Sequence, residues 1–175
     1  IAPIVEAGPD DTLNCYQPEL LLNATVNTGG LQSAWTDVGG NLLSDTLSLL
    51  VAQPGPYTFT ATDPANGCSA TDQLEISLDT LAPGVAIAAP QILNCDLTSQ
   101  QLDGSASSTG AEFSYTWTDS LGQELGNDLL LPVQQPGNYT LTIFNQENGC
   151  SSSATVEVSQ DTALPVPVIA DPEVL

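Results

Sequence analysis

Four cysteines are the residues of this chain whose type and spacing could do covalent chemistry: Cys15, Cys68, Cys95 and Cys150. They form two similar pairs, each with Leu-Asn-Cys at its start and Asn-Gly-Cys at its end. Zinc is the competing use, but the chain has no His and no Cys-x-x-Cys, so disulfides are favoured. The simplest pairing joins Cys15 to Cys68 and Cys95 to Cys150, and it predicts an oxidising compartment.

Catalytic chemistry has few residues to work with. A nucleophilic Ser, Thr or Cys needs a neighbouring base, commonly His or Lys, and the chain contains no Lys, Arg or His. A glycosidase could use two of the 21 acidic residues, but its cleft is normally lined with aromatic side chains. Only 5% of the residues are aromatic, so we expect no enzyme.

The net charge of −21 limits the partners. A surface of one negative sign repels phosphates, so we expect neither nucleic acid nor an anionic membrane as a partner. No apolar run is long enough to enter a bilayer. Cations, neutral carbohydrates and copies of the chain itself remain as partners.

Calcium is the one cofactor for which the chain carries suitable ligands, because carboxylates and carbonyls are its natural partners. Asp79 and Asp161 stand at equivalent places before Pro-containing linkers, and Asp10 and Asp11 precede the first cysteine. These four residues are candidate calcium ligands. Solvated acidic turns are the alternative interpretation.

The elements that would position these residues come from an internal repeat. Trp-Thr-Asp, Pro-Gly, Asn-Gly-Cys and Asp-Thr all recur about 80 residues later in the same order. The spacing from Pro165 to Leu175 matches that from Pro3 to Leu13, which predicts that a third copy starts at residue 163. We therefore expect a first domain over residues 1–80, a second over 81–162 and the first strand of a truncated third over 163–175.

Each copy alternates apolar and polar residues in short runs separated by Gly, Pro, Asn and Asp, which is typical of an all-β sandwich. Trp35, Trp117, Tyr57 and Tyr139 are the expected large core residues, because a sandwich needs bulky side chains between its sheets. The expected strands lie near 3–7, 19–27, 31–37, 47–52, 56–63 and 71–78, and near 84–88, 99–104, 112–118, 129–134, 138–145 and 153–159.

Residues 102–108, 115–117, 136–142 and 148–150 contain the motifs Leu-Asp-Gly-Ser, Tyr-Thr-Trp, Pro-Gly-Asn-Tyr and Asn-Gly-Cys in this order. With these motifs the chain resembles the polycystic-kidney-disease (PKD) type of immunoglobulin-like repeat, in the cysteine-containing form of giant surface proteins and gliding adhesins of Bacteroidetes-type bacteria. The resemblance covers both copies and the start of the third. The family's Asp-Phe-Gly-Asp-Gly turn after the Trp is replaced here by Thr-Asp-Val-Gly-Gly over residues 36–40 and by Thr-Asp-Ser-Leu-Gly over residues 118–122. The resemblance implies tandem immunoglobulin-like sandwiches that serve as spacer, stalk or adhesive modules without catalysis.

These observations favour a structural segment of an extracellular or cell-surface bacterial fibre, stalk or filament, in which neighbouring repeats or further copies are the partners. An adhesive module whose loops recognise carbohydrate or a host surface is the alternative. Filament assembly by strand exchange is a third hypothesis.

Overall fold

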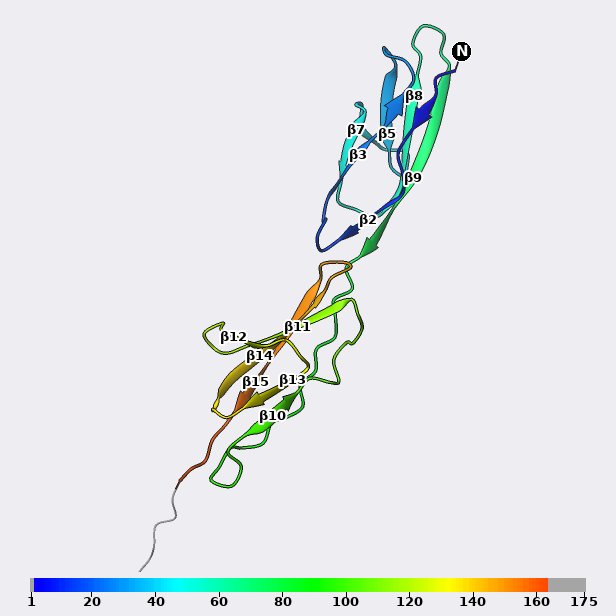
Figure 1. The fold of residues 1–175 in the computed structure, drawn as a ribbon. Coiled ribbons are helices and arrows are strands. Elements are labelled where there is room, and N and C mark those ends of the chain that lie inside the picture. The colour runs from blue at the N-terminus through cyan, green and yellow to red at the C-terminus, as the bar shows by residue number, and fades with distance from the viewer. Residues whose placement is uncertain (1, 164–175) are drawn as a thin grey trace, which may run out of the picture. The chain divides into compact units, whose positions relative to one another are not determined.

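A computed structural model describes residues 2–163 (Figure 1). Strands and turns make up this range, and it contains no helix, so the expected all-β class is confirmed. The expected strand of a third copy falls almost wholly on residues 164–175, which lie outside the described residues.

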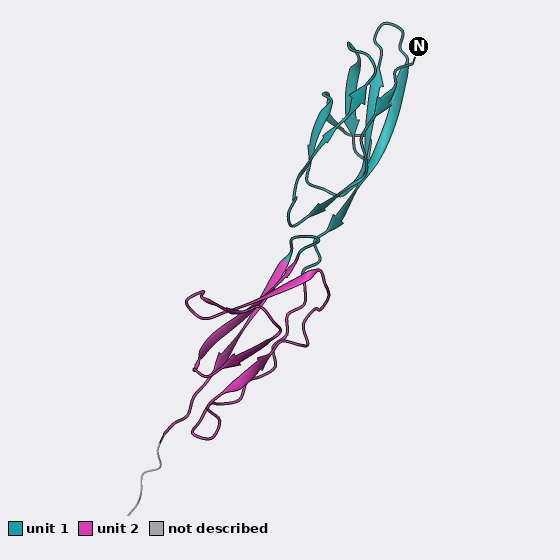
Figure 2. Cartoon of the chain, viewed as in Figure 1, with its two compact units in different colours: residues 1–82, 146–150 teal, residues 83–145, 151–175 magenta. Residues whose placement is uncertain are grey.

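The chain divides into two compact units, coloured separately in Figure 2. The first comprises residues 1–82 together with 146–150, and the second comprises residues 83–145 and the chain from 151 onward. A short segment of the second sequence copy therefore belongs to the first unit.

The first unit is a sandwich with a large sheet in the order β2-β9-β8-β5-β6. The facing layer holds the β3–β7 and β1–β4 pairs, both antiparallel. Within the large sheet β2 runs parallel to β9, whereas the other neighbours are antiparallel. The strands are β1 (Val5–Glu6), β2 (Asp11–Asn14), β3 (Leu20–Asn23), β4 (Thr25–Val26), β5 (Gln32–Thr36), β6 (Leu42–Ser44), β7 (Ser48–Val51), β8 (Gly55–Thr62) and β9 (Ser69–Asp79).

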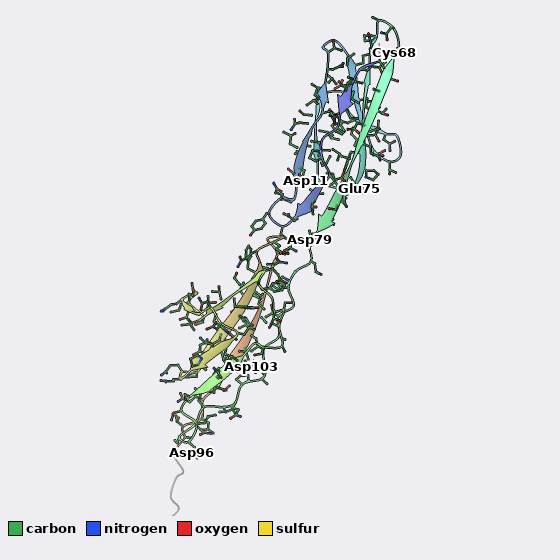
Figure 3. The ribbon with its side chains drawn as sticks, turned by 45° about the vertical axis from the view of Figure 1, so that its right-hand side comes forward. Asp11, Cys68, Glu75, Asp79, Asp96 and Asp103 are labelled. Carbon is green, nitrogen blue, oxygen red and sulfur yellow. A yellow bond between two sulfur atoms is a disulfide. The ribbon has the colours of Figure 1, made fainter. Side chains whose placement is uncertain are left out.

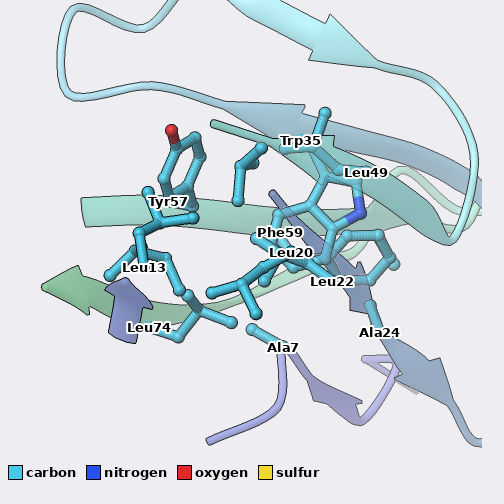
Figure 4. Packing of buried hydrophobic residues seen from close by; sticks show 13 residues of the cluster. Ala7, Leu13, Leu20, Leu22, Ala24, Trp35, Leu49, Tyr57, Phe59 and Leu74 are labelled. Carbon is cyan, nitrogen blue, oxygen red and sulfur yellow. The ribbon is translucent and has the colours of Figure 1, made fainter. Parts of the chain in front are cut away.

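The core of the first unit lies between these layers (Figure 4). Successive side chains of a strand point to opposite faces, and in β8 the buried residues Tyr57, Phe59 and Ala61 alternate with half-buried threonines. Trp35 is fully buried, and its ring centroid lies 5.0 Å from that of Phe59. This pair fills the space between the sheets.

The second unit repeats the plan with fewer strands. One sheet has the order β12-β11-β14-β15, and β10 pairs with β13 in the other layer. Trp117 and Leu141, the counterparts of Trp35 and Phe59, are both fully buried. The strands are β10 (Gln100–Asp103), β11 (Phe113–Thr118), β12 (Glu124–Gly126), β13 (Leu130–Val133), β14 (Gly137–Asn145) and β15 (Ser151–Val158).

Two local features identify both sandwiches as immunoglobulin-like, in agreement with the strand order. A tryptophan is buried at an equivalent strand of each, Trp35 on β5 and Trp117 on β11. A tyrosine hydroxyl at the start of β8 or β14 donates to a backbone carbonyl four residues upstream: Tyr57 to Gln53 at 2.8 Å, and Tyr139 to Gln135 at 2.9 Å. This is the tyrosine corner of that fold.

The strand expected over 84–88 is not present. Side chains replace its ladder: the Ser107 hydroxyl bonds both the N–H and the C=O of Ala86, and the Ser108 hydroxyl accepts from Gly84 N. Ala88 N keeps a backbone bond to Asp103 O at 2.8 Å, and Gly84 O accepts one from Ser108 N at 2.9 Å. Three short strands, β2, β6 and β12, were not expected from the sequence.

Candidate functional site

Cys15 and Cys150 form a disulfide within the first unit, with their Cα atoms 5.1 Å apart. The predicted pairs Cys15–Cys68 and Cys95–Cys150, and with them one disulfide in each domain, are therefore wrong. Cys68 is a half-buried free thiol, and Cys95 is an exposed free thiol.

The parallel pairing of β2 with β9 explains this correction. It places Asn14 beside Asp79, at the end of β9, so Cys15 lies just beyond that end. Cys68 immediately precedes Ser69, the first residue of β9, and Figure 3 shows Cys68 and Asp79 at opposite ends of the strand. At about 3.3 Å per residue, eleven residues separate the two cysteines by about 35 Å, whereas a disulfide needs Cα atoms within about 7 Å.

The second unit has the same geometry. Leu93 bridges Gln160 in a parallel sense, so the turn at Cys95 lies past the end of β15. Cys150 precedes the first residue of that strand. The two cysteines of each sequence copy are thus held at opposite ends of its last strand.

Asn14 shapes the turn that presents Cys15. Its Oδ1 accepts from Tyr16 N at 3.0 Å and from Gln17 N at 2.9 Å, and its own N–H donates to Gln17 O. Such a side-chain turn is the usual role of Asn next to a tight loop. The turn leaves Cys15 N free to donate to Asn148 O at 2.9 Å.

Asn148 is the buried polar centre of the site, with 2% of its surface exposed. Its Nδ2 donates to Asp79 Oδ1 at 2.9 Å and to Leu81 O at 3.0 Å. Its Oδ1 accepts from Cys150 N at 3.0 Å. Because both amide donors and the acceptor are used, the side chain stabilises the site without an unpaired buried group.

Tyr16 and Gly149 complete the cluster. A Cβ on Gly149 would lie 2.6 Å from Cγ of Tyr16, so the ring lies directly on the glycine. The hydroxyl of Tyr16 donates to Gln146 O at 3.3 Å. Gly149 also has φ of 75°, a region that favours glycine. We call Cys15, Tyr16, Asp79, Asn148 and Cys150 the staple cluster.

The staple cluster contains one of the four candidate calcium ligands, Asp79, and the structure does not bring the four together. Asp10 Oδ1 accepts from Glu75 N at 2.8 Å, Asp11 Oδ1 from Thr12 N at 2.7 Å, and Asp161 Oδ1 from Ala163 N at 3.1 Å. Across residues 2–163 no three His, Cys, Asp or Glu side chains gather into a group that could hold a metal ion. The arrangement at Asp79 is a hydrogen-bonded carboxylate with an amide donor.

An open hollow of about 350 Å³ lies elsewhere on the first unit, beside the loop that carries Cys68. Its lining mixes amide, carboxylate and apolar groups: Ala2, Pro3, Asn27, Thr28, Leu31, Asp63 and Asn66.

No helix within residues 2–163 has the length and apolar character needed to cross a membrane.

No family model and no curated protein matches the chain. Solved structures similar to it include Drosophila OTK extracellular domains 3–5 (15% identity, 92% of this chain and 60% of that one, TM-score 0.49) and three N-terminal domains of the bacteriophage RB49 outer capsid protein Hoc (17%, 91% and 58%, 0.41). A third is the N-terminal four Ig domains of Dscam1 (11%, 95% and 53%, 0.39). The chain spans little more than half the length of these three chains. The fold assignment rests on strand order and the tyrosine corners.

Proposed function

We propose that this chain is a structural tandem-repeat segment of an extracellular fibre or stalk, built from repeats over 1–80, 81–162 and 163–175. The staple cluster is the observation that carries the proposal. In it, a disulfide joins a cysteine of the first sequence copy to a cysteine of the second. A bond of this kind adds a covalent connection between successive copies beyond the backbone, which is what a load-bearing array requires.

The hydrogen bonds of the cluster support the same role. Asn148 is buried and fully paired with Asp79 and Leu81, and Tyr16 covers Gly149. These contacts surround the disulfide with specific packing, so the residues around it are ordered together with it. A bond formed by chance oxidation of exposed thiols would need no such surroundings.

The chemistry of the chain points to a cell exterior. A disulfide with a buried partner, Cys150 at 2% exposure, is retained in oxidising compartments and is rare in the cytosol. The resemblance to PKD-type repeats favours a bacterial surface. The net charge of −21 would keep neighbouring fibres apart at low salt, because like charges repel.

Electron microscopy of the native material, with the mass of its parent polypeptide, tests this proposal. We expect filaments with an axial repeat set by one sandwich, and we expect the Cys15–Cys150 peptide pair in material alkylated before digestion. Because trypsin has no Lys or Arg to cut, the mapping needs cleavage at acidic or aromatic residues. Compact particles without filaments would overturn the proposal.

An adhesive module is the second candidate function, and the hollow beside Asn27, Asp63 and Asn66 is the observation that favours it. Amide and carboxylate groups at the rim of a shallow hollow can hydrogen-bond neutral carbohydrate. Glycan-array binding that is lost in Asn27→Ala, but kept in a control such as Asn41→Ala on a distant turn, would support it. Equal signals for the two variants would count against it.

A further inference from the structure

The four cysteines lie in two kinds of turn, and each kind occurs twice. In the Asn-Gly-Cys loops the asparagine Oδ1 accepts from the cysteine N–H, at 3.0 Å for Asn148 and Cys150 and at 2.8 Å for Asn66 and Cys68. The glycines also agree, with φ of 75° at Gly149 and 69° at Gly67. The loop carrying Cys68 therefore has the backbone conformation of the loop that forms the disulfide.

The Asn-Cys turns match equally well. Asn94 Oδ1 accepts from Asp96 N at 2.9 Å and from Leu97 N at 2.8 Å, and Asn94 N donates to Leu97 O. Asn14 makes the same three bonds around Cys15. Cys95 is therefore presented in the way in which Cys15 is presented to Cys150.

One carboxylate acceptor near the Asn-Cys turn of Cys95 is also in place. In the staple cluster Asp79 Oδ1 accepts from Leu81 N at 3.4 Å while it accepts the Asn148 amide. Asp161, the counterpart of Asp79, accepts from Ala163 N at 3.1 Å and is exposed. Its carboxylate is oriented by the same turn that orients Asp79.

We propose that Cys95 of one chain forms a disulfide with Cys68 of a second copy. The Asn66 amide of that copy, one N–H of which bonds Asp63 at 2.7 Å, donates its other N–H to Asp161 as Asn148 does to Asp79. This inference rests on the proposed function, because the Asn-Cys turn of one repeat again meets the Asn-Gly-Cys loop of another repeat, here supplied by a second chain. The two surfaces differ, so the contact is heterologous and can continue from copy to copy into a filament instead of closing into a dimer.

The reaction needs an oxidant, and a small-molecule disulfide such as oxidised glutathione supplies it. The Cys95 thiolate attacks one sulfur of the oxidant, forms a mixed disulfide and expels one glutathione thiolate. The Cys68 thiolate then attacks the Cys95 sulfur and expels the second thiolate. One protein disulfide forms, one glutathione disulfide is reduced, and the two protons from the cysteines pass to the two glutathione thiolates.

The new contact has fewer non-covalent groups than the staple cluster. Asp96 stands where Tyr16 stands in the first copy, and Gly67 has no atom within 4 Å of its Cβ position. With Asp96 and Asp161 both acidic, the approach of two copies is opposed by charge and is favoured by salt. Association should therefore depend on oxidation.

The test uses the whole chain, purified without reductant so that Cys15–Cys150 stays intact, at about 0.15 M salt where charges are screened beyond about 8 Å. Oxidised glutathione is added, and products are separated on non-reducing gels. We expect a ladder of covalent multimers that collapses with reductant, and peptide mapping should find Cys68–Cys95 in most intermolecular bonds. Random pairing of two equally reactive thiols would give that bond in only half.

Cys68→Ser and Cys95→Ser are matched controls. Each alone should stop the ladder, and a mixture of the two should give a dimer joined through the one remaining Cys68 and the one remaining Cys95. Asp161→Asn, which keeps the shape but removes the charged acceptor, should lower the Cys68–Cys95 yield, whereas Asp128→Asn should not. Homotypic Cys68–Cys68 and Cys95–Cys95 bonds at random frequency, or thiols that end capped by glutathione, would overturn the inference.

Native material separates this inference from the proposed function. Filaments in which Cys68 and Cys95 are alkylated as free thiols would overturn the staple and leave the structural-repeat proposal standing. Native material without filaments would overturn the proposed function, whatever the purified chain does with oxidant.

Discussion

The two Asn-Gly-Cys loops have the same sequence and the same internal hydrogen bond but opposite surroundings. Asn148 is buried and its amide donates to Asp79 and Leu81, while Asn66 is exposed and its amide donates to Asp63 within its own loop at 2.7 Å. Cys150 is bonded, and Cys68 is free.

This difference shows that the local sequence determines the conformation of the Asn-Gly-Cys turn. The segment that packs against the turn determines whether its cysteine forms a disulfide. Both loops place a cysteine at the start of a long strand. Only the loop that meets an Asn-Cys turn becomes a disulfide with a buried amide beside it. Variants that alter one loop at a time measure how much the surroundings of each loop contribute to the free energy of unfolding.

The largest difference should come from the disulfide itself. Replacing Cys15 and Cys150 together by Ser should lower the free energy of unfolding by about 2–5 kcal/mol, the usual loss when a native disulfide is removed. Replacing Cys68 and Cys95 together by Ser should change it by about 0.5 kcal/mol or less, as for other surface changes. Guanidinium unfolding followed by tryptophan fluorescence measures both. Equal losses would mean that the observed pairing is wrong.

The amide of Asn148 should give the next largest difference. Asn148→Ala removes two donors and one acceptor from a buried position and should cost about 1–3 kcal/mol, whereas Asn66→Ala in the exposed loop should cost about 0.5–1 kcal/mol. Both variants keep the Cys15–Cys150 bond, so the comparison excludes loss of the disulfide. Thermal or chemical unfolding of the two variants side by side measures the two losses of stability. Equal losses would contradict the prediction.

The cores of the two sandwiches could be predicted from the sequence, because the alternation of apolar and polar residues is a local signal. Tyr57, Phe59 and Ala61 alternate with threonines over a long strand, and the tryptophans recur at equivalent places, so the sandwich could be recognised. The strand β2 could not, because Asp11–Asn14 has a single buried apolar residue, Leu13, and its parallel partner is far along the chain.

That missed strand led directly to the wrong cysteine pairs. Without the β2–β9 register, nothing in the sequence keeps the two cysteines of a copy apart, and nearness in sequence favours pairing them. Tyr16 was missed for a related reason: one exposed tyrosine after a cysteine has no periodic pattern, and its contact with Gly149 depends on long-range structure. Its counterpart Asp96 was the one available signal, since the copies differ there.

The two loop glycines should separate backbone strain from contact with Tyr16. Gly149→Ala and Gly67→Ala both force an L-residue into a left-handed conformation, which costs about 1–2 kcal/mol. Only Gly149→Ala also pushes against the Tyr16 ring, which should add about 1 kcal/mol.

A double-mutant cycle checks this assignment. In a Tyr16→Ala background the excess cost of Gly149→Ala should disappear, and the two glycine variants should lose equal stability. An excess that persists without the ring would mean that the loop conformation, not Tyr16, makes Gly149 special.

The two tyrosine corners should show no difference between the units, which makes them a control for the whole comparison. Burial, with a smaller effect of Asp37, raises the pKa of Tyr57 above 10.0, and burial with Asp119 raises that of Tyr139 in the same way. Since folding favours the neutral phenol, this stabilisation is fully present below the unfolded-state pKa near 10 and is lost as pH rises through the higher folded-state pKa.

Tyr57→Phe and Tyr139→Phe each remove one hydroxyl bond and should each cost about 0.5–1.5 kcal/mol at neutral pH. The parent chain should lose stability above pH 10 as its buried phenols ionise. In each variant this loss should be smaller, because one of the two phenols is absent. Ultraviolet titration of phenolate in parent and variant assigns the two raised pKa values by difference. Unequal losses would show that the tyrosine corners, and not only the Asn-Gly-Cys loops, distinguish the two units.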